Sequence, residues 1–388
     1  MAKVRLGDIA TVVTKGTTPT TIGFRFEDSG INFVKIESIS EDGTFLKEKF
    51  SHISDECNVQ MRRSQLQEND ILFSIAGAIG RSAIVTKEIL PANTNQALAI
   101  IRVPKGKIDY NYLLYALSSS AINQQATQHQ QGVAQLNISL KNVSDFLLPI
   151  YTEAMQKRIV HNLKKIDKLI FLRKQQLSKL DELVKAQFAN TFENDANFHT
   201  DYMENLSEFV TVGIANSATH AYAEHGVVML RNQNIKENHL DDTELVYIEP
   251  NFADKYKSKK LESNDILVTR TGYPGIACIV PQKYAGCQTF TTLIIRLKKE
   301  ANVSSCYICH YINSSHGKKY VSGTKVGVAQ QNFGAKALAK MPVVVPPINL
   351  QNDFAAFVER VNQQKQTVQQ SLEKLELMKK ALMQEYFG

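Results

Sequence analysis

Apolar residues recur at alternating spacings of three and four along two long stretches of the chain, 153–188 and 351–386. This spacing is typical of an amphipathic helix that packs against a second helix. Arg173 interrupts the central seam, whereas Gln364 and Ser371 interrupt the closing one, so we expect polar contacts to fix the register. The central seam comprises Leu163, Ile166, Ile170, Leu177, Leu180 and Val184, and the closing seam Phe354, Phe357, Val361, Val368, Leu375, Met378 and Leu382.

Two short sequence phrases each occur twice in the chain, and the distance between the two occurrences is the same for both phrases. NDILFSIAGAIG at 69–80 returns as NDILVTRTGYPG at 264–275, which is 195 positions later. GVAQLNI at 132–138 returns as GVAQQNF at 327–333, again 195 positions later. Because two separate phrases share one offset, the sequence predicts a duplicated module. The repeat is about 190 residues long, which is too long for a solenoid repeat and indicates a duplicated domain.

Each copy has a mixed pattern of short apolar segments and polar turns that precedes its long helix. The segments rich in β-branched residues predict strands, and Tyr-rich runs at 110–118 and 307–313 predict short helices. The predicted strands are 31–36, 71–75, 83–85 and 97–103 in the first copy, and 227–230, 266–269, 276–280 and 292–297 in the second.

These patterns predict an α+β fold of two duplicated mixed α/β domains, joined by two long helices packed as an antiparallel coiled coil with pseudo-two-fold symmetry. Each helix is about 54 Å long at 1.5 Å per residue, too long to bury its seam in one small domain. The alternative is that each helix packs only on its own domain. The expected boundaries are a first domain at 1–150, a central helix at 151–192, a second domain at 193–345 and a C-terminal helix at 346–388.

Composition narrows the class of protein. A chain of 388 residues is long enough for two or three domains. Its formal charge of +7 is modest, so a polyanionic partner is allowed without being required. The N-terminus lacks the pattern of a secretory signal, and no run approaches the ~20 apolar residues of a membrane span. We therefore expect a cytoplasmic protein that does not bind membranes, with its five cysteines reduced.

The motifs of common catalytic sites are absent. Cys306, Cys309 and His310 match the C-x-x-C-H pattern of haem attachment, but the equivalent positions of the first copy, 195 residues earlier, are Asn111, Leu114 and Tyr115. We therefore interpret them as core residues of a helix. The chain also lacks a phosphate-binding loop, an Asn-Pro-Pro-Tyr or Asp-Pro-Pro-Tyr tetrapeptide, and a Glu-x-Lys nuclease motif. We expect no catalytic residue, no metal site and no cofactor in this chain.

Polar and glycine-containing loops occur at equivalent places in both copies. Arg and Lys side chains reach guanine edges, Asn and Gln reach adenine, and Thr contacts phosphates. For any single residue the alternative is a solvated side chain or a turn. The candidate DNA-binding residues are Lys15, Thr17, Thr18, Ser74, Arg81, Gln131 and Gln135 in the first copy, and Arg231, Asn232, Gln233, Asn234, Thr269, Arg270, Tyr273, Gln330 and Gln331 in the second.

The repeated plan resembles the specificity subunit of type I restriction-modification systems. The resemblance rests on NDIL, a G-x-x-G loop, G-V-A-Q, a proline-containing entry and a glutamine-bearing long helix in each half. It implies two target-recognition domains that each read half of a bipartite site in double-stranded DNA. It also implies that the helices act as a spacer and dock two modification subunits, beside a separate restriction and translocase subunit. S-adenosylmethionine, ATP and Mg²⁺ are then expected on those partners only.

Two other classes of protein stay open on the sequence alone. One is a stand-alone DNA methyltransferase or nuclease, which the missing motifs disfavour. The other is a structural adaptor that uses its coiled coil to assemble. Differences between the copies, such as Ser74-Ile-Ala against Thr269-Arg-Thr, predict that the two halves of a DNA site would differ.

Overall fold

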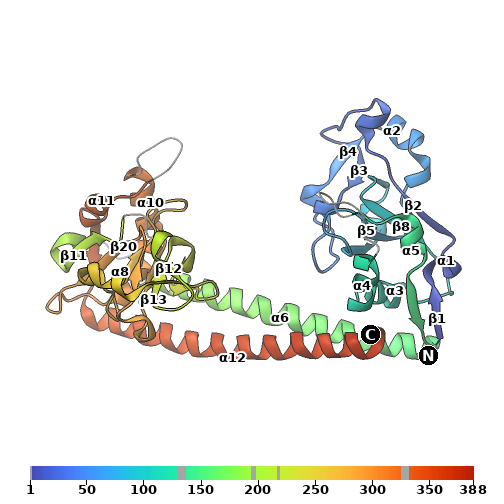
Figure 1. Ribbon diagram of the computed structural model, residues 1–388. Coiled ribbons are helices and arrows are strands. Elements are labelled where there is room, and N and C mark those ends of the chain that lie inside the picture. The colour runs from blue at the N-terminus through green and yellow to red at the C-terminus, as the bar shows by residue number, and fades with distance from the viewer. Residues whose placement is uncertain (1, 129–136, 194–197, 216–218, 325–331) are drawn as a thin grey trace. The chain divides into compact units, whose positions relative to one another are not determined.

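The computed structural model describes residues 2–128, 137–193, 198–215, 219–324 and 332–388, and its chain divides into two compact units (Figure 1). The first unit comprises Met1–Lys174 and Gln369–Gly388, and the second comprises Gln175–Val368. The two long helices are α6, Glu153–Phe192, and α12, Ile348–Phe387. Each long helix therefore contributes one part to each unit.

The first unit is built on a four-stranded antiparallel sheet in the order β2-β8-β5-β6. A smaller sheet, β4-β3-β7, pairs β3 and β7 in parallel, and β1 pairs with β9. The strands are β1 Ala2–Arg5, β2 Val12–Lys15, β3 Ile31–Val34, β4 Ser51–Ile53, β5 Ile71–Ser74, β6 Ser82–Ile84, β7 Ala92–Thr94, β8 Leu98–Arg102 and β9 Leu147–Ile150. The helices are α1 Leu6–Ile9, α2 Asp55–Gln60, α3 Tyr110–Leu117, α4 Ser120–Gln128 and α5 Leu140–Ser144.

Both faces of the central sheet of the first unit are covered. Ile71 and Phe73 of β5 pack into the core that contains α3, whereas Leu72 points into a separate core on the opposite face. This alternation follows from the two-residue period of a strand. It also explains why the strand is a continuous apolar run rather than an alternating one.

The second unit repeats this plan. Its main sheet has the order β11-β20-β17-β18, and its smaller sheet pairs β13 and β19 in parallel. The strands are β10 His199–Tyr202, β11 Ser207–Val212, β12 Tyr222–Ala223, β13 Val227–Leu230, β14 Ile235–Lys236, β15 His239–Leu240, β16 Val246–Ile248, β17 Ile266–Val268, β18 Ala277–Ile279, β19 Gln288–Thr289, β20 Leu293–Leu297 and β21 Pro342–Val345. The helices are α7 Met203–Leu206, α8 Pro250–Lys255, α9 Ser305–Asn313, α10 Ser315–Thr324 and α11 Ala335–Ala339.

An ion pair with a buried aspartate explains why the phrase NDIL occurs twice. Asp70 is fully buried, and Nε and Nη2 of Arg102 each donate to one of its oxygens at 2.6 Å. Asp265 is 2% exposed, and Arg296 binds it in the same way at 2.9 and 2.8 Å. The asparagine before each Asp, Asn69 or Asn264, has a positive φ of 69° or 71°. The repeated phrase is therefore a structural element of the fold.

The two long helices run antiparallel within each unit. In the first unit, Ile159 and Leu163 near the start of α6 share a core with Tyr386 and Phe387 at the end of α12. In the second unit the end of α6 meets the start of α12, where the rings of Phe188 and Phe354 lie 5.4 Å apart. The helices also pack on the domain of the same unit, because those cores contain its sheet residues.

The expected register of the closing seam is partly wrong. Phe354, Val361 and Val368 are buried as expected. The other fully buried positions of this seam on α12 are Val358 and Leu372, which were not predicted. Met378 is 54% exposed and Gln364 is exposed, so neither belongs to the seam. Phe357 is half-buried against the second domain, and Ser371 is half-buried beside Leu372. Leu375 and Leu382 are half-buried in the seam.

Lysines are the polar members of the closing seam. Lys365 and Lys379 continue the spacing of three and four, and their amines lie 2.6 Å from the carboxylates of Asp181 and Asp167 on α6. On α6, Leu163, Ile166 and Val184 are buried, whereas Ile170, Leu177 and Leu180 are half-buried. Polar contacts therefore occur along the seam, as expected, and they include Lys365 and Lys379, which were not predicted. No helix in the described part of the chain is long and apolar enough to cross a membrane.

Candidate nucleic-acid interface

A glycine loop follows the third strand of the main sheet in each domain. Loop 1, residues 75–81, joins β5 to β6, and loop 2, residues 270–276, joins β17 to β18. The glycines of loop 1 have φ values of 69° and 91°, and those of loop 2 have 75° and 91°. These values lie in the left-handed region that favours glycine. The two loops therefore share one backbone conformation, which places the tip of each outside its sheet.

A hydroxyl at the start of each loop holds that conformation. The Ser74 hydroxyl donates to the Ala76 carbonyl at 3.0 Å. In loop 2, the Thr269 hydroxyl donates to the Tyr273 carbonyl at 2.7 Å and accepts from the Ile276 amide at 2.9 Å. Ser74 is fully buried and Thr269 is 3% exposed. The hydroxyls of these two candidate residues are thus used inside the domain to shape the loops.

The second repeated phrase supports the same loops. The Ile138 amide donates to the Ile75 carbonyl at 3.0 Å, and the Phe333 amide donates to the Arg270 carbonyl at 3.0 Å. Ile138 is the last residue of the phrase GVAQLNI, and Phe333 is the last residue of GVAQQNF. The candidate residues Gln131, Gln135, Gln330 and Gln331 precede these anchors and lie outside the described residues.

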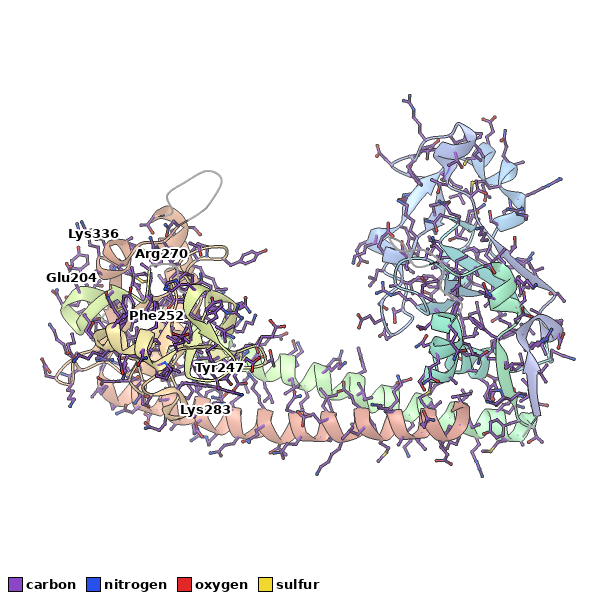
Figure 2. All side chains as sticks on the ribbon, viewed as in Figure 1. Glu204, Tyr247, Phe252, Arg270, Lys283 and Lys336 are labelled. Atoms are coloured by element: carbon purple, nitrogen blue, oxygen red, sulfur yellow. The ribbon has the colours of Figure 1, made fainter. Side chains whose placement is uncertain are left out.

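Loop 2 and the residues bonded to it include three of the candidates, Asn232, Arg270 and Tyr273, and Figure 2 labels Arg270. Nε of Arg270 donates to Oδ1 of Asn332 at 3.0 Å, and its backbone amide donates to Oδ1 of Asn232 at 3.4 Å. Nδ2 of Asn232 donates to the Thr271 hydroxyl at 2.9 Å. Tyr273 at the tip is 85% exposed. Loop 2 therefore presents a guanidinium and an aromatic ring from a backbone that is hydrogen-bonded on both sides.

Loop 1 presents different chemistry from the same scaffold. Ile75 and Ala78 stand where loop 2 has Arg270 and Tyr273. Arg81 ends the loop, and its Nη1 donates to the carbonyls of Ile39 at 2.9 Å and Ile36 at 3.4 Å. That guanidinium holds loop 1 against the neighbouring segment of its own domain.

The other candidate residues of the second domain lie around β13. Asn234 is buried, and its Nδ2 donates to the carbonyls of Asp241 and Glu244, so it has a structural function. Nη2 of Arg231 also donates to the Glu244 carbonyl, whereas its Nε is buried without a hydrogen-bond partner among the described residues. Gln233 is exposed beside them, with its Nε2 3.4 Å from a carboxylate oxygen of Glu244.

The remaining candidate residues of the first domain flank the end of β2. Lys15 is exposed, and Thr17 and Thr18 are half-buried. The Thr18 hydroxyl donates to Oε1 of Gln96 at 2.5 Å. The structure thus brings Asn232, Arg270 and Tyr273 together, but it does not bring Lys15 into contact with loop 1 through any described hydrogen bond.

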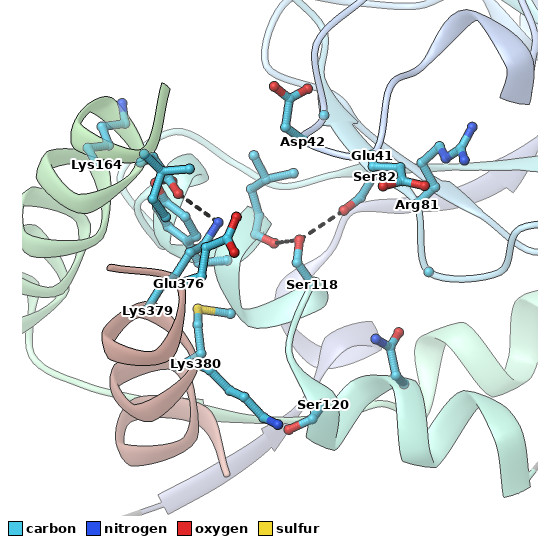
Figure 3. A pocket seen from close by; sticks show the side chains of 18 of the residues that line it. Glu41, Asp42, Arg81, Ser82, Ser118, Ser120, Lys164, Glu376, Lys379 and Lys380 are labelled. Carbon is cyan, nitrogen blue, oxygen red and sulfur yellow. Dashed lines mark hydrogen bonds and ion pairs between the residues drawn. The ribbon is translucent and has the colours of Figure 1, made fainter. Parts of the chain in front are cut away.

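A cleft of about 1400 Å³ in the first unit separates loop 1 from the long helices (Figure 3). Lys164 and Lys168 line its α6 wall, and Glu41 and Asp42 line the domain wall. The hydrogen bond from Ser40 lowers the pKa of Asp42 below its usual value, so this carboxylate stays ionised. Both walls carry charges of both signs, because Arg81 lies on the domain wall and Asp167 and Glu376 lie on the helical wall.

Buried glutamines connect each domain to its long helix. Oε1 of Gln156 accepts from the Asp109 amide at 3.0 Å, and its Nε2 donates to the Tyr151 carbonyl at 2.8 Å. Gln351 repeats this arrangement with the Ser304 amide at 2.9 Å and the Pro346 carbonyl at 2.8 Å. These residues are 4% and 0% exposed. Because buried amides are costly to leave unpaired, the start of each helix is fixed to its domain.

Cys309 and His310 of the C-x-x-C-H pattern are buried in the core, as expected, and Cys306 is partly buried against it. Cys309 is fully buried, and the His310 ring stacks on the Phe188 ring at 6.2 Å. Burial lowers the pKa of His310 to about 4, so the ring is neutral at pH 7. Its Nδ1 lies 2.9 Å from the Cys306 carbonyl. No group of three or more His, Cys, Asp or Glu side chains in the described ranges is arranged to hold a metal ion.

Comparisons with known proteins agree on one family. A family model described as the type I restriction modification DNA specificity domain matches residues 1–182 and 189–377. The specificity subunit of the type I restriction enzyme EcoBI from Escherichia coli is 29% identical over 172 residues, which cover 43% of this chain and 35% of that subunit. The match thus spans about a third of the length of that relative.

Two solved structures resemble the whole chain. One is described as a structural basis for complex assembly and conformational transition of the type I R-M system, and it aligns with a TM-score of 0.64 and 14% identity over 100% of this chain and 97% of that one. The other is the S subunit of a type I restriction-modification system from M. genitalium, with a TM-score of 0.53 and 13% identity over 100% and 96% of the two chains. At these identities the likeness concerns the fold alone.

Proposed function

The chain belongs to the family of type I restriction-modification DNA specificity domains, and we propose that each of its two domains reads one half of a bipartite site in double-stranded DNA. The membership confirms the resemblance that the repeated phrases indicated. It also confirms the expected fold class and the non-catalytic role in DNA recognition.

The observation that carries the proposal is one loop scaffold with two sets of side chains. Loops 1 and 2 have the same glycine conformations, and a buried hydroxyl at the start of each loop donates to a carbonyl of that loop. Their side chains differ, with Ile75 and Ala78 in one and Arg270 and Tyr273 in the other. Because base edges are read by side-chain hydrogen bonds and apolar contacts, the two half-sites differ in sequence and the full site is asymmetric.

The helices set the distance between the half-sites and dock the modification subunits. Gln156 and Gln351 fix each helix to its domain, so a domain follows the position of its helix. Exposed apolar side chains on the helices, including Phe171 at 57% and Leu377 at 67%, provide surface for a protein partner. Two modification subunits on this surface supply methyl transfer from S-adenosylmethionine. A restriction and translocase subunit brings the use of ATP and Mg²⁺.

The test is the methylation pattern that this chain directs. Genomic DNA from a host that carries the chain with its modification subunit is read by single-molecule sequencing. We expect methylated adenines in one motif with two unlike halves separated by a fixed number of unspecified bases. Methylation without a bipartite motif, or none above that of the modification subunit alone, contradicts the proposal.

A domain exchange supplies the matched control. Residues 199–345 run from β10 to β21, as residues 2–150 run from β1 to β9. A chain that carries a copy of 2–150 in place of 199–345 has the same reader twice. We expect it to direct methylation of a site with two identical halves, and retention of the original asymmetric motif argues against assigning one half-site to each domain.

A further inference from the structure

One face of α6 in the first unit carries only basic and neutral side chains for three turns. Arg158, His161, Lys164, Lys165 and Lys168 are all exposed. Their spacings of three and four place them on the same side of a helix. None of the four Arg and Lys side chains has an ion-pair partner among the described residues. They cover about 15 Å of helix at 1.5 Å per residue, and we call them the basic face.

The fold itself does not require this charge. Like charges three and four residues apart destabilise a helix, so the basic face weakens α6 in isolation. The duplication provides an internal comparison, because the positions of α12 that lie 195 residues later pack in the same way. Those positions hold Asp353, Ala356, Glu359, Arg360 and Gln363. A helix with the same exposed positions thus exists with one cation and two carboxylates in place of four cations. A ligand with negative charge explains the excess of cations on α6.

The basic face lies beside the first domain. Lys164 and Lys168 border the cleft whose other lining includes loop 1, and Figure 3 shows Lys164 extending from α6 without a drawn interaction. By contrast, Lys379 in the same cleft is paired with Asp167. The opposite wall carries the carboxylates of Glu41 and Asp42 and the guanidinium of Arg81. Arg158, His161 and Lys165 do not line the cleft, so most of the basic face lies on the outer surface of α6.

We propose that the basic face binds the phosphates of DNA that flanks the half-site read by the first domain. The inference rests on the proposed function and adds a contact that is independent of base sequence. DNA matches the face better than a single acidic side chain does, because a duplex carries one negative charge per about 1.7 Å along its axis. Several cations in a row can then each meet a phosphate.

The test compares two charge variants with equal change in net charge. Lys165→Gln/Lys168→Gln removes two cations from the basic face, and Arg360→Gln/Lys374→Gln removes two exposed cations from α12. Glutamine is a good helix former, and circular dichroism melting checks that both variants fold. Each variant is assembled with its modification subunits, and its affinity for DNA with the bipartite site is measured from low to physiological salt.

Counterion release predicts the result. Each phosphate contact adds about 0.9 to the slope of log K against log salt concentration. In the face variant we expect the magnitude of this slope to fall by about 2, while the preference for both half-sites is unchanged. The α12 variant should keep the slope of the original chain. Equal slopes in all three proteins overturn the inference.

Two further outcomes separate this inference from the proposed function. The face variant can instead assemble poorly with the modification subunits while the complexes that do form keep the original slope. In that case the face binds an acidic protein surface and the DNA assignment is wrong. If the original complex shows no preference for the bipartite site over scrambled DNA, the proposed function itself fails. A changed slope with intact half-site preference supports both.

Discussion

Nζ of Lys379 on α12 lies 2.6 Å from Oδ1 of Asp167 on α6. The other oxygen of Asp167 accepts a hydrogen bond from the Tyr115 hydroxyl of α3 at 2.7 Å. One carboxylate thus connects both long helices to the first domain. Burial, followed by the hydrogen bond to Asp167, raises the pKa of Tyr115, so this hydroxyl stays protonated and donates at any working pH.

A double-mutant cycle tests the contribution of this ion pair. Lys379→Ala, Asp167→Asn and the double variant are unfolded with urea, and the coupling between the two positions is taken from the four free energies of unfolding. The side chains are 37% and 36% exposed, so we expect a coupling of about 0.5 kcal/mol. A coupling near zero means that the pair fixes geometry without adding stability.

The corrected register of the closing seam gives a second prediction. Leu372 is 6% exposed, whereas Met378 is 54% exposed. We expect Leu372→Ala to lower the free energy of unfolding by about 2 kcal/mol, because it removes buried contacts between the helices. Met378→Ala is the control and should change it by less than about 0.5 kcal/mol. The reverse order of the two effects contradicts the register.

The error in that register shows what the sequence could supply. Apolar spacing alone allows Phe357 or Val358 as the partner of Phe354. The repeat offset resolves the choice, because Leu163, Ile166 and Leu177 lie 195 residues before Val358, Val361 and Leu372. Helix existence, antiparallel pairing and the duplicated domains were predictable from periodicity and repeats. The register required the second copy as a template.

The DNA-binding residues were less predictable from the sequence, because the same polar residue types can contact DNA or hold a loop in its conformation. Ser74 and Arg81 lie at the two ends of loop 1 and Asn234 follows β13, yet the polar groups of all three bind within their own domains. Asn332, which orients Arg270, ends a Gln-rich run but was not singled out as a candidate residue. Only the hydrogen-bond partners in the folded structure distinguish a side chain that holds the loop from one that can reach DNA. The buried pair of Asp70 and Arg102 was also missed, although the repeated NDIL marks its Asp.

Arg270 gives a prediction about specificity. Its guanidinium is oriented by Asn332 at the base of loop 2, so Arg270→Ala should weaken binding at the second half-site only, by about 1–3 kcal/mol for a bidentate contact to guanine. Binding is measured on DNA with either half-site scrambled. Arg81→Ala is the control, because that guanidinium binds carbonyls of its own domain. Arg81→Ala should therefore lower the free energy of unfolding. If Arg270→Ala weakens binding equally at both half-sites, Arg270 does not read the second half-site.

His310 makes the stability of the second unit depend on pH. Its pKa is lowered to about 4 by burial, whereas the ring titrates near 6.5 when the chain is unfolded. Below pH 6.5 the unfolded state binds the proton more tightly, so stability falls as the pH drops from 6.5 towards 4. Between pH 7 and 5 we expect a loss of about 2 kcal/mol from this group. Urea unfolding at both pH values measures the loss, and His310→Phe should abolish most of it.

The spacer role of the helices predicts the effect of lengthening them. A seven-residue insertion keeps the heptad phase, so one heptad is added to α6 between Lys174 and Gln175 and one to α12 between Val368 and Gln369, where the two units divide. Seven residues add about 10 Å of helix, and base pairs are about 3.4 Å apart. We therefore expect the methylated motif to keep both halves while its spacer grows by up to about 3 base pairs. A three-residue insertion at the same points breaks the seam and should abolish assembly. An unchanged spacer with the heptad insertion means that something other than the helices sets the distance between the half-sites.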